Sequence, residues 1–353
     1  MKHCIMIIIL IALTGCSPEL VDMSESINTY QKNNGRQICS FFDLEINGCM
    51  QKVLIESKDT INNPVLLYLH GGPGSSALIY SHIYSDKLRD NFIFVNWDQR
   101  GTAYSYHEGM DPSEMSEEQI RDDALELTLY LLKRFNKKKI FLAGHSFGSV
   151  LGLQLAANHP ELFFAYIGIG QVIPSKWDES VKITYNWLHG ELIKNNDLEG
   201  LKRIEKDHFP YIDLVTKYGG HHRLSINLET LKRTSPYYFN GYDEMAERGR
   251  DFSQGNVCEG RSIGNLFYKL DYKIKSMVNR SIYRIDIPLF FFEGENDHVI
   301  ACAPELVVEY CNMARAPKKE IVWFHDSAHM MNIEEPEKFQ NELIRIKKET
   351  IRE

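Results

Sequence analysis

A serine, an aspartate and a histidine occupy positions from which they could act together in nucleophilic catalysis. Ser146 lies in Gly-His-Ser-Phe-Gly at 144–148, directly after a predicted strand and before a predicted helix. That context is typical of a tight turn that presents a serine oxygen above the edge of a sheet. A serine hydroxyl is a weak nucleophile near neutral pH, so it needs a base and a group that orients the base.

Asp297 and His329 are the candidates for these two roles. Asp297 follows the predicted strand 288–292, and His329 follows the predicted strand 320–324. Both therefore fall at the carboxyl ends of strands, where an open α/β sheet gathers its catalytic groups. We expect His329 to take the proton from Ser146 and Asp297 to orient His329.

Nearby residues leave alternatives open for both roles. Glu293 and Glu295 could replace Asp297, and His325 could replace His329. His325 lies almost on its predicted strand, whereas His329 has enough loop before it to reach inward. This difference favours His329 as the base.

A glycine-rich segment could stabilise the negative charge that develops on an attacked carbonyl. His-Gly-Gly-Pro-Gly at 70–74 ends the predicted strand 64–69. Glycines let backbone N–H groups approach the reacting oxygen without interference from a Cβ atom. We expect the N–H groups of Gly72 and Phe147 to form an oxyanion hole, in which one donor is worth on the order of 3–4 kcal/mol.

An α/β sheet must position these residues. The alternating pattern from 37 to 55, with Asn-Gly at 47–48, predicts an antiparallel hairpin. Short apolar runs separated by loops or helices are typical of buried parallel strands. These runs are 64–69, 92–97, 139–143, 163–169, 288–292 and 320–324. The alternation predicts a mostly parallel, doubly wound sheet with an N-terminal antiparallel hairpin.

A different pattern separates the fourth and fifth of these runs. From 172 to 286, amphipathic stretches rich in aromatic residues predict a helical cap inserted into the sheet order. His221 and His222 are expected to be exposed cap residues rather than metal ligands, because no third ligand stands at a suitable spacing. The predicted parts are a signal peptide at 1–15, a linker at 16–36, the first part of the core at 37–171, the cap at 172–286 and the second part of the core at 287–353.

The first residues predict export and a lipid anchor. An apolar run at 5–13 behind a basic start is too short to span a bilayer and is typical of a secretory signal. Leu-Thr-Gly-Cys at 13–16 resembles the lipobox of bacterial lipoproteins, in which acyl chains on the cysteine, here Cys16, bind the membrane. An ordinary cleaved signal is the alternative, although its small-residue site is absent. We expect an exported, membrane-anchored lipoprotein, and Ser17 favours the outer membrane.

Composition argues against a nucleic-acid partner. The chain has 353 residues, of which 43% are hydrophobic, and 40 Lys+Arg against 48 Asp+Glu give a formal net charge of −8. No run of basic residues supplies a local field for a phosphate backbone.

Export permits disulfides, so the cysteines bear on the fold. Five of the seven remain once the signal cysteine and the anchor are set aside. Pairing across the predicted hairpin places Cys39 opposite Glu56 rather than opposite Cys49, and Cys302 and Cys311 on one helix would face opposite sides. Buried free thiols are therefore expected.

Together these features resemble the proline iminopeptidase family of α/β-hydrolases. The motifs that carry the resemblance are His-Gly-Gly-Pro-Gly at 70–74, Asp-Gln-Arg-Gly at 98–101, the serine turn at 144–148, Asp297 and His329. The likeness covers most of the mature chain apart from the cap. It implies an α/β-hydrolase fold, a triad and an oxyanion hole made by Ser146, Asp297, His329, Gly72 and Phe147.

In that family, glutamates of the cap recognise the free amine of a substrate that loses its N-terminal residue, often proline. The candidates here, each of which could instead be a solvated helix charge, are Glu179, Glu191, Glu244 and Glu247. The chain departs from many members at His145 and Phe147, where serine and tryptophan are usual. Arg100 is expected to be ion-paired beneath the site rather than catalytic.

The expected activity is hydrolysis of a short peptide or amino-acid amide through an acyl-enzyme on Ser146. This chemistry requires no metal and no organic cofactor. One alternative is an esterase or lactonase that uses the same triad. Another is a non-catalytic surface binding protein that keeps the fold.

Overall fold

The computed structural model describes residues 28–32, 36–206, 211–257 and 283–351. Within these ranges nine strands form one sheet, in the order β1-β2-β3-β5-β4-β6-β7-β8-β9. The strands are β1 (Asn28–Lys32), β2 (Gln37–Ile46), β3 (Cys49–Ser57), β4 (Val65–Leu69), β5 (Ile93–Trp97), β6 (Ile140–His145), β7 (Phe163–Ile169), β8 (Leu289–Gly294) and β9 (Lys319–Phe324).

Helices follow most of the parallel strands. The α-helices are α1 (Ser81–Tyr84), α2 (Leu88–Asn91), α3 (Glu117–Arg134), α4 (Phe147–Asn158), α5 (Trp177–Lys194), α6 (Leu198–Lys206), α7 (Ile212–Lys217), α8 (Leu228–Arg233), α9 (Tyr242–Val257), α11 (Pro304–Met313), α12 (Met331–Glu334) and α13 (Pro336–Thr350). Short 3-10 helices lie at Leu78–Tyr80, Ala103–Ser105, Pro112–Glu114, Pro160–Leu162 and Pro174–Lys176.

The sheet has two parts that differ in strand direction. The pairs β1·β2, β2·β3 and β3·β5 are antiparallel, whereas every pair from β5 through β4, β6, β7 and β8 to β9 is parallel. The mostly parallel sheet with an antiparallel N-terminal hairpin is thus confirmed. The predicted strands agree with the observed ones to within two residues at each end.

Two apolar layers hold the helices against opposite faces of the sheet. Successive side chains of a strand point to opposite faces. Leu67 and Leu69 accordingly pack with residues of α3, α4 and α11, whereas Leu66 and Tyr68 pack with residues of α1, α2 and α13. The alternation explains why β4 is buried at every position. Both layers fix the carboxyl ends of the parallel strands in space.

Local turn chemistry fixes the register of the hairpin and the start of α3. Asn47 and Gly48 both have positive φ, as a two-residue turn requires, and Ile46 pairs with Cys49. Ser116 precedes α3, and its hydroxyl accepts a hydrogen bond of 3.0 Å from the backbone N–H of Gln119. Both features follow from the residues at these positions.

One strand was not predicted. β1 lies inside the segment 16–36, which the sequence predicts to be a linker, and it pairs with β2 from Asn28 opposite Phe41 to Lys32 opposite Gln37. The predicted signal peptide at 1–15 and the predicted anchor Cys16 lie outside the described residues.

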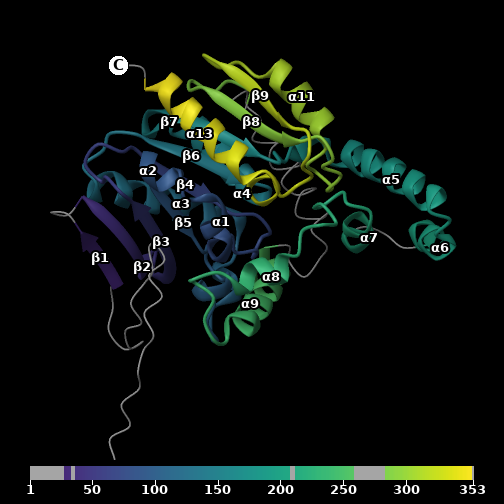
Figure 1. Cartoon of the computed structure of the whole chain (residues 1–353), viewed down its shortest axis with the longest axis horizontal. Coiled ribbons are helices and arrows are strands. Elements are labelled where there is room, and N and C mark those ends of the chain that lie inside the picture. Colours follow the sequence, from purple (N-terminus) through teal and green to yellow (C-terminus); the bar gives the residue numbers. More distant parts are fainter. Residues whose placement is uncertain (1–27, 33–35, 207–210, 258–282, 352–353) are drawn as a thin grey trace, which may run out of the picture.

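The segment between β7 and β8 forms helices α5 to α9 in its described part, as expected for a cap. Figure 1 shows α5, α6 and α7 on the side of the view away from β1, and α8 and α9 low in the middle, below α1. Among the described helices, none combines the length and the apolar character needed to cross a membrane.

The expectation of free cysteines holds only in part. Cys49, Cys302 and Cys311 are free thiols, but Cys39 is disulfide-bonded. Cys39 does lie opposite Glu56, as the hairpin register predicts. The strand register excluded a bridge between Cys39 and Cys49, yet it carried no information about cysteines elsewhere in the chain.

Candidate active site

Ser146 stands on a sharp turn between β6 and α4. Its backbone has φ 52° and ψ −121°, a conformation that non-glycine residues rarely adopt, and its N–H donates to the carbonyl oxygen of Ile169 at 2.9 Å. A Cβ atom on Gly144 would lie 2.4 Å from the carbonyl oxygen of Gly148, so glycine is required there. The strained turn is the arrangement that exposes a nucleophile above a sheet.

His329 and Asp297 lie beside each other after β9 and β8. The Nδ1 atom of His329 is 2.7 Å from Oδ2 of Asp297, and both side chains are buried. The other carboxylate oxygen of Asp297 accepts a hydrogen bond of 2.9 Å from the N–H of Val299, which fixes the carboxyl group. With Nδ1–H donating to Asp297, the Nε2 lone pair is available to accept a proton.

The structure separates the competing residues from this pair. Glu295 and His325 form their own pair at 3.1 Å, and both side chains are more than half exposed. Glu293 is fully buried, and one of its oxygens accepts from the N–H of Gln171 at 3.2 Å. The hydrogen bond between Asp297 and His329 therefore favours these two residues over all three rivals.

Burial controls the protonation of the buried acids and of His329. Desolvation raises the pKa of Glu293 well above its ordinary value, and the charge of Asp297 raises it too. Desolvation also raises the pKa of Asp297, while the hydrogen bond from the N–H of Val299 lowers it. Desolvation lowers the pKa of His329. His329 is therefore neutral at pH 7, as a general base must be.

Two further histidines surround His329. His145 has its ring 4.7 Å from that of His329, and its Nε2–H donates to the backbone carbonyl oxygen of His329 at 3.0 Å. The ring of His221 lies 5.7 Å from that of His329 on the cap side. The prediction that His221 and His222 are exposed is wrong, because both are half-buried and their Nδ1 atoms are 2.8 Å apart.

A short cap segment is hydrogen-bonded to the loops that carry Asp297 and His329. The carbonyl oxygen of Gly220 accepts from the N–H of His298, and the carbonyl oxygen of His221 accepts from the N–H of His329, at 2.9 and 3.0 Å. Sequence reasoning missed these links. They depend on backbone groups, which carry no sequence signal.

Glu334 also joins the cap to the His329 loop. One carboxylate oxygen accepts from the N–H groups of Ala328 and Met330, at 2.9 and 3.2 Å, on either side of His329. The other oxygen accepts from the N–H of Arg223 in the cap at 2.5 Å. Glu334 is the last residue of the four-residue helix α12 and stands beside Glu335, so no sequence pattern singled it out for this role.

A cavity of about 790 Å³ is lined by two of the three candidate catalytic residues. Ser146 and His329 line it together with residues of the glycine-rich segment and of the cap. Cys302, a buried free thiol, lines the same cavity. The site is thus closed on one side by the sheet and on the other by the cap.

The two predicted oxyanion donors lie at this cavity or at its base. Gly72 lines the cavity and has φ +114°. Phe147 is the first residue of α4, and the first N–H groups of a helix have no partner within the helix. Gly72 and Phe147 therefore stay candidates for the two oxyanion donors.

One of the four candidate glutamates faces the cavity. Glu247, on α9, lines it. The other three are exposed or half-buried and pair with neighbouring cations, Glu179 with Lys176, Glu191 with Lys194 and Glu244 with Arg248. In the described part of the chain, no group of three or more His, Cys, Asp or Glu side chains is arranged to hold a metal ion.

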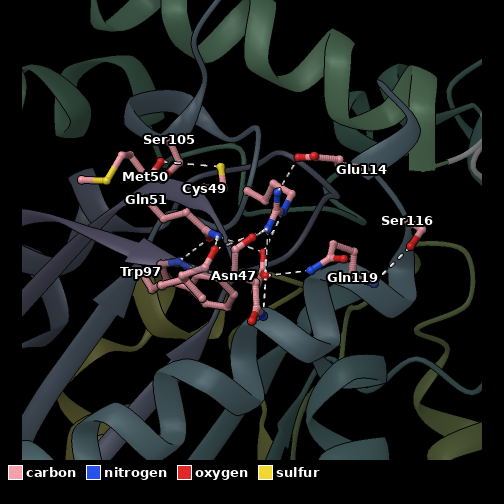
Figure 2. A network of polar contacts seen from close by, with 12 residues as sticks. Asn47, Cys49, Met50, Gln51, Trp97, Ser105, Glu114, Ser116 and Gln119 are labelled. Atoms are coloured by element: carbon pink, nitrogen blue, oxygen red, sulfur yellow. Dashed lines mark hydrogen bonds and ion pairs between the residues drawn. The ribbon is translucent and has the colours of Figure 1, made fainter. Parts of the chain in front are cut away.

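Arg100 is ion-paired, as expected. Its guanidinium donates to both carboxylate oxygens of Asp123, at 2.8 and 3.0 Å, and the two side chains are 1% and 0% exposed. Figure 2 shows the polar side chains of Asn47, Gln51 and Gln119 converging on this pair, and all three donate to Asp123. The network joins the β2–β3 turn to α3, and none of these residues lines the cavity.

Comparison with known proteins places the chain among hydrolases. It is 30% identical over 320 residues to the "Probable aminopeptidase YbaC" of Bacillus subtilis (strain 168), covering 88% of this chain and 96% of that protein. It is 26% identical over 292 residues to the proline iminopeptidase of Saccharolobus solfataricus, covering 79% and 83% of the two chains.

Solved structures show the fold. The crystal structure of proline iminopeptidase from Mycobacterium smegmatis superposes with a TM-score of 0.64 at 15% identity, covering 88% of this chain and 98% of that chain. The crystal structure of VinJ superposes with a TM-score of 0.62 at 17% identity, covering 88% and 99%. The mostly parallel sheet with its helical cap is accordingly an α/β-hydrolase fold.

A family model described as serine aminopeptidase, S33, matches residues 62–336. This range runs from the strand before the glycine-rich segment to the start of α13, and so it contains Ser146, Asp297 and His329. The chain therefore belongs to the serine aminopeptidase S33 family of α/β-hydrolases.

Proposed function

We propose that the protein is a serine aminopeptidase of the proline iminopeptidase type, which removes the N-terminal residue of short peptides or amino-acid amides. One observation carries the proposal. Ser146, on its strained turn, lines the same cavity as His329, and Nδ1 of His329 is hydrogen-bonded to Asp297. The resemblance of the chain to named aminopeptidases supports it.

The reaction follows from these positions. Ser146 Oγ attacks the substrate carbonyl carbon while His329 Nε2 takes the hydroxyl proton, and Asp297 stabilises the imidazolium. The N–H groups of Gly72 and Phe147 stabilise the negative oxygen. His329 then gives the proton to the leaving amine, and water attacks the acyl-enzyme in the same way.

Glu247 supports the choice of a substrate with a free amine. Its carboxylate lies on the cap wall of the cavity that Ser146 lines from the other side. A carboxylate at this position attracts an ammonium group and holds the first residue of a peptide against the nucleophile. An ester without an amine would gain nothing from this contact.

The activity is tested with matched reporters on purified protein. Prolyl and alanyl amides should be hydrolysed, a fluorophosphonate probe should label the wild type, and Ser146→Ala should lose both reactions. Turnover of acyl esters without any turnover of aminoacyl amides would instead assign an esterase or lactonase. Equal probe labelling of the wild type and Ser146→Ala would support a non-catalytic binding protein.

We also propose that the mature chain begins at a lipidated Cys16 and is held on the outer membrane. The proposal rests on the Leu-Thr-Gly-Cys segment and on Ser17 after it. Mass spectrometry of the mature N-terminus tests it directly. An unmodified Cys16, or cleavage at another position, would contradict it.

A further inference from the structure

His70, the first residue of the glycine-rich segment, is buried beside the candidate oxyanion hole. Its ring makes two hydrogen bonds with backbone groups. Nε2 lies 3.0 Å from the backbone N of Gln99, and Nδ1 lies 2.8 Å from the carbonyl oxygen of Gly71. Neither contact involves a residue of the candidate triad.

The partner of Nε2 determines the tautomer of this ring. A backbone N–H can only donate, so Nε2 of His70 must accept from Gln99 with its lone pair. Burial lowers the pKa of His70 to about 4, so the ring is neutral near pH 7 and carries one N–H. That N–H is therefore on Nδ1, and it donates to Gly71.

A second hydrogen bond and burial fix Gln99 beside His70. Its side-chain amide donates to the carbonyl oxygen of His70 at 2.9 Å, and the residue is buried. The two residues are thus joined by two hydrogen bonds, one from the backbone and one from the side chain of Gln99. His70 cannot turn its ring over without breaking the bond to Gln99.

The bond to Gly71 has a consequence for the next N–H. The Gly71–Gly72 peptide bond is trans, so its C=O and its N–H point in opposite directions. Because His70 holds the Gly71 carbonyl on its own side, the N–H of Gly72 points away from His70. A Cβ atom on Gly71 would lie 2.9 Å from Cβ of Ser146, so this peptide runs directly against the nucleophile.

We propose that His70 is a positioning residue whose Nδ1–H, imposed by Gln99, holds the Gly71–Gly72 peptide with its N–H toward the oxyanion. The proposal rests on the proposed serine hydrolase function. It gives a joint role to the glycine-rich segment at 70–74 and to the Asp-Gln-Arg-Gly segment at 98–101. A fixed donor needs no reorientation when the negative charge develops, which is how oxyanion holes lower the barrier.

Two substitutions separate the two nitrogens of His70. In His70→Asn the amide N–H can take the place of Nδ1–H and donate to Gly71. In His70→Gln the amide reaches the place of Nε2 instead, so the bond to Gly71 is lost. We expect kcat to fall about 10- to 100-fold in His70→Gln and by about threefold or less in His70→Asn, because a misplaced oxyanion donor costs at most what a removed donor costs.

The pattern in KM distinguishes this role from general damage to the fold. KM should stay within about twofold of wild type in both variants, since the oxyanion hole acts on the transition state and not on the bound substrate. Thermal unfolding should show the same midpoint for the two variants. Equal kcat values in both variants, or a more active His70→Gln, would overturn the proposal.

Two further measurements test the tautomer of His70 and the underlying serine mechanism separately. The ¹⁵N spectrum of histidine-labelled wild-type enzyme reports the tautomer of His70 without any substitution, and a proton on Nε2 would reject the proposal. Ser146→Ala is the control for the underlying function. Full activity in Ser146→Ala would reject the serine mechanism itself, whereas an inactive Ser146→Ala beside two fully active His70 variants would reject only the role of His70.

Discussion

The residue before the candidate nucleophile holds the candidate base by its backbone, since Nε2–H of His145 donates to the carbonyl oxygen of His329 at 3.0 Å. The contact places two imidazole rings 4.7 Å apart, with a third, from His221, on the cap side of His329. The turn at 144–148 and the loop after β9 are thereby joined directly. Because these histidines are neutral in the folded chain, the stability of the fold should depend on pH.

The first prediction is that acid destabilises the fold. Desolvation, together with the charge of His329, lowers the pKa of His145 and of His221 from 6.5 to about 3. Between these values the two histidines bind more protons in the unfolded chain than in the folded chain, so their contribution to the free energy of unfolding decreases as pH falls from 6.5 toward 3. Urea denaturation at a series of pH values measures this slope.

A matched pair of variants assigns that slope. His145→Gln keeps an N–H that can donate to the carbonyl oxygen of His329 but removes the titrating ring, so it should flatten the pH dependence. His325→Gln removes an exposed histidine that pairs only with Glu295, and it should leave the slope unchanged. Equal slopes in all three proteins would contradict the prediction.

The second prediction separates Asp297 from its buried neighbour. Asp297→Asn removes the carboxylate charge and can turn an amide N–H toward Nδ1, which favours the wrong tautomer of His329, so kcat should fall by about 10⁴-fold. Glu293→Gln should keep most of the activity, because burial raises the pKa of Glu293 and the amide resembles the neutral acid. Steady-state measurements of kcat for both variants test this prediction. A larger loss in Glu293→Gln would move the orienting role to that residue.

The third prediction concerns the link between cap and catalytic loop. Glu334→Gln weakens charge-assisted hydrogen bonds to the N–H groups of Ala328, Met330 and Arg223, each worth about 1.5–3 kcal/mol. Both stability and kcat should fall, and KM should rise because the cap wall loosens. Chemical denaturation and substrate titration give these values.

Glu335→Gln is the control for this effect. Glu335 accepts from the N–H of Asp326 at 3.2 Å and from the hydroxyl of Ser327 at 2.7 Å, both in the same loop as His329. These bonds do not reach the cap, so stability should fall while KM stays near wild type. An equal rise of KM in both variants would show that the cap contact has no separate effect.

The fourth prediction assigns Arg100 to stability. Arg100→Met leaves Asp123 buried without its cation, which costs about 3–5 kcal/mol in the free energy of unfolding. Arg121→Met, on the same helix as Asp123, breaks longer ion pairs, to Glu117 at 3.8 Å and to Asp122 at 3.4 Å, and a hydrogen bond to Gln154, so it should cost less. Denaturant titration compares the two. A large decrease of kcat in a folded Arg100→Met variant would instead indicate that Arg100 has a role in catalysis.

The fifth prediction tests recognition of the substrate amine. Glu247→Gln should raise KM for free-amine substrates about tenfold, which corresponds to about 1.4 kcal/mol, and should leave N-blocked substrates unaffected. Glu244→Gln, on the same helix α9 but paired with Arg248, should change neither value. Substrate series with free and acetylated amines supply the comparison. Equal effects on both series would remove Glu247 from the amine site.

Much of the fold could be predicted from the sequence because strands, turns and helix starts depend on neighbouring residues. The parallel strands, the Asn47–Gly48 turn and the Ser116 cap all lie where local patterns indicate. β1 was missed, since its pairing with β2 depends on a partner strand and not on a strong pattern of its own. The disulfide of Cys39 was missed for the same reason.

The candidate site divides in the same way. The sequence by itself determined the nucleophile turn, the glycine-rich segment and a short list of acids and bases, because these residue types are recognisable from their spacing along the chain. Only the tertiary structure decided that Asp297 rather than Glu293 or Glu295 bonds to His329, and that Glu334 and His221 surround the base. Such contacts join segments far apart in sequence, so they exist only once the sheet and the cap have packed together.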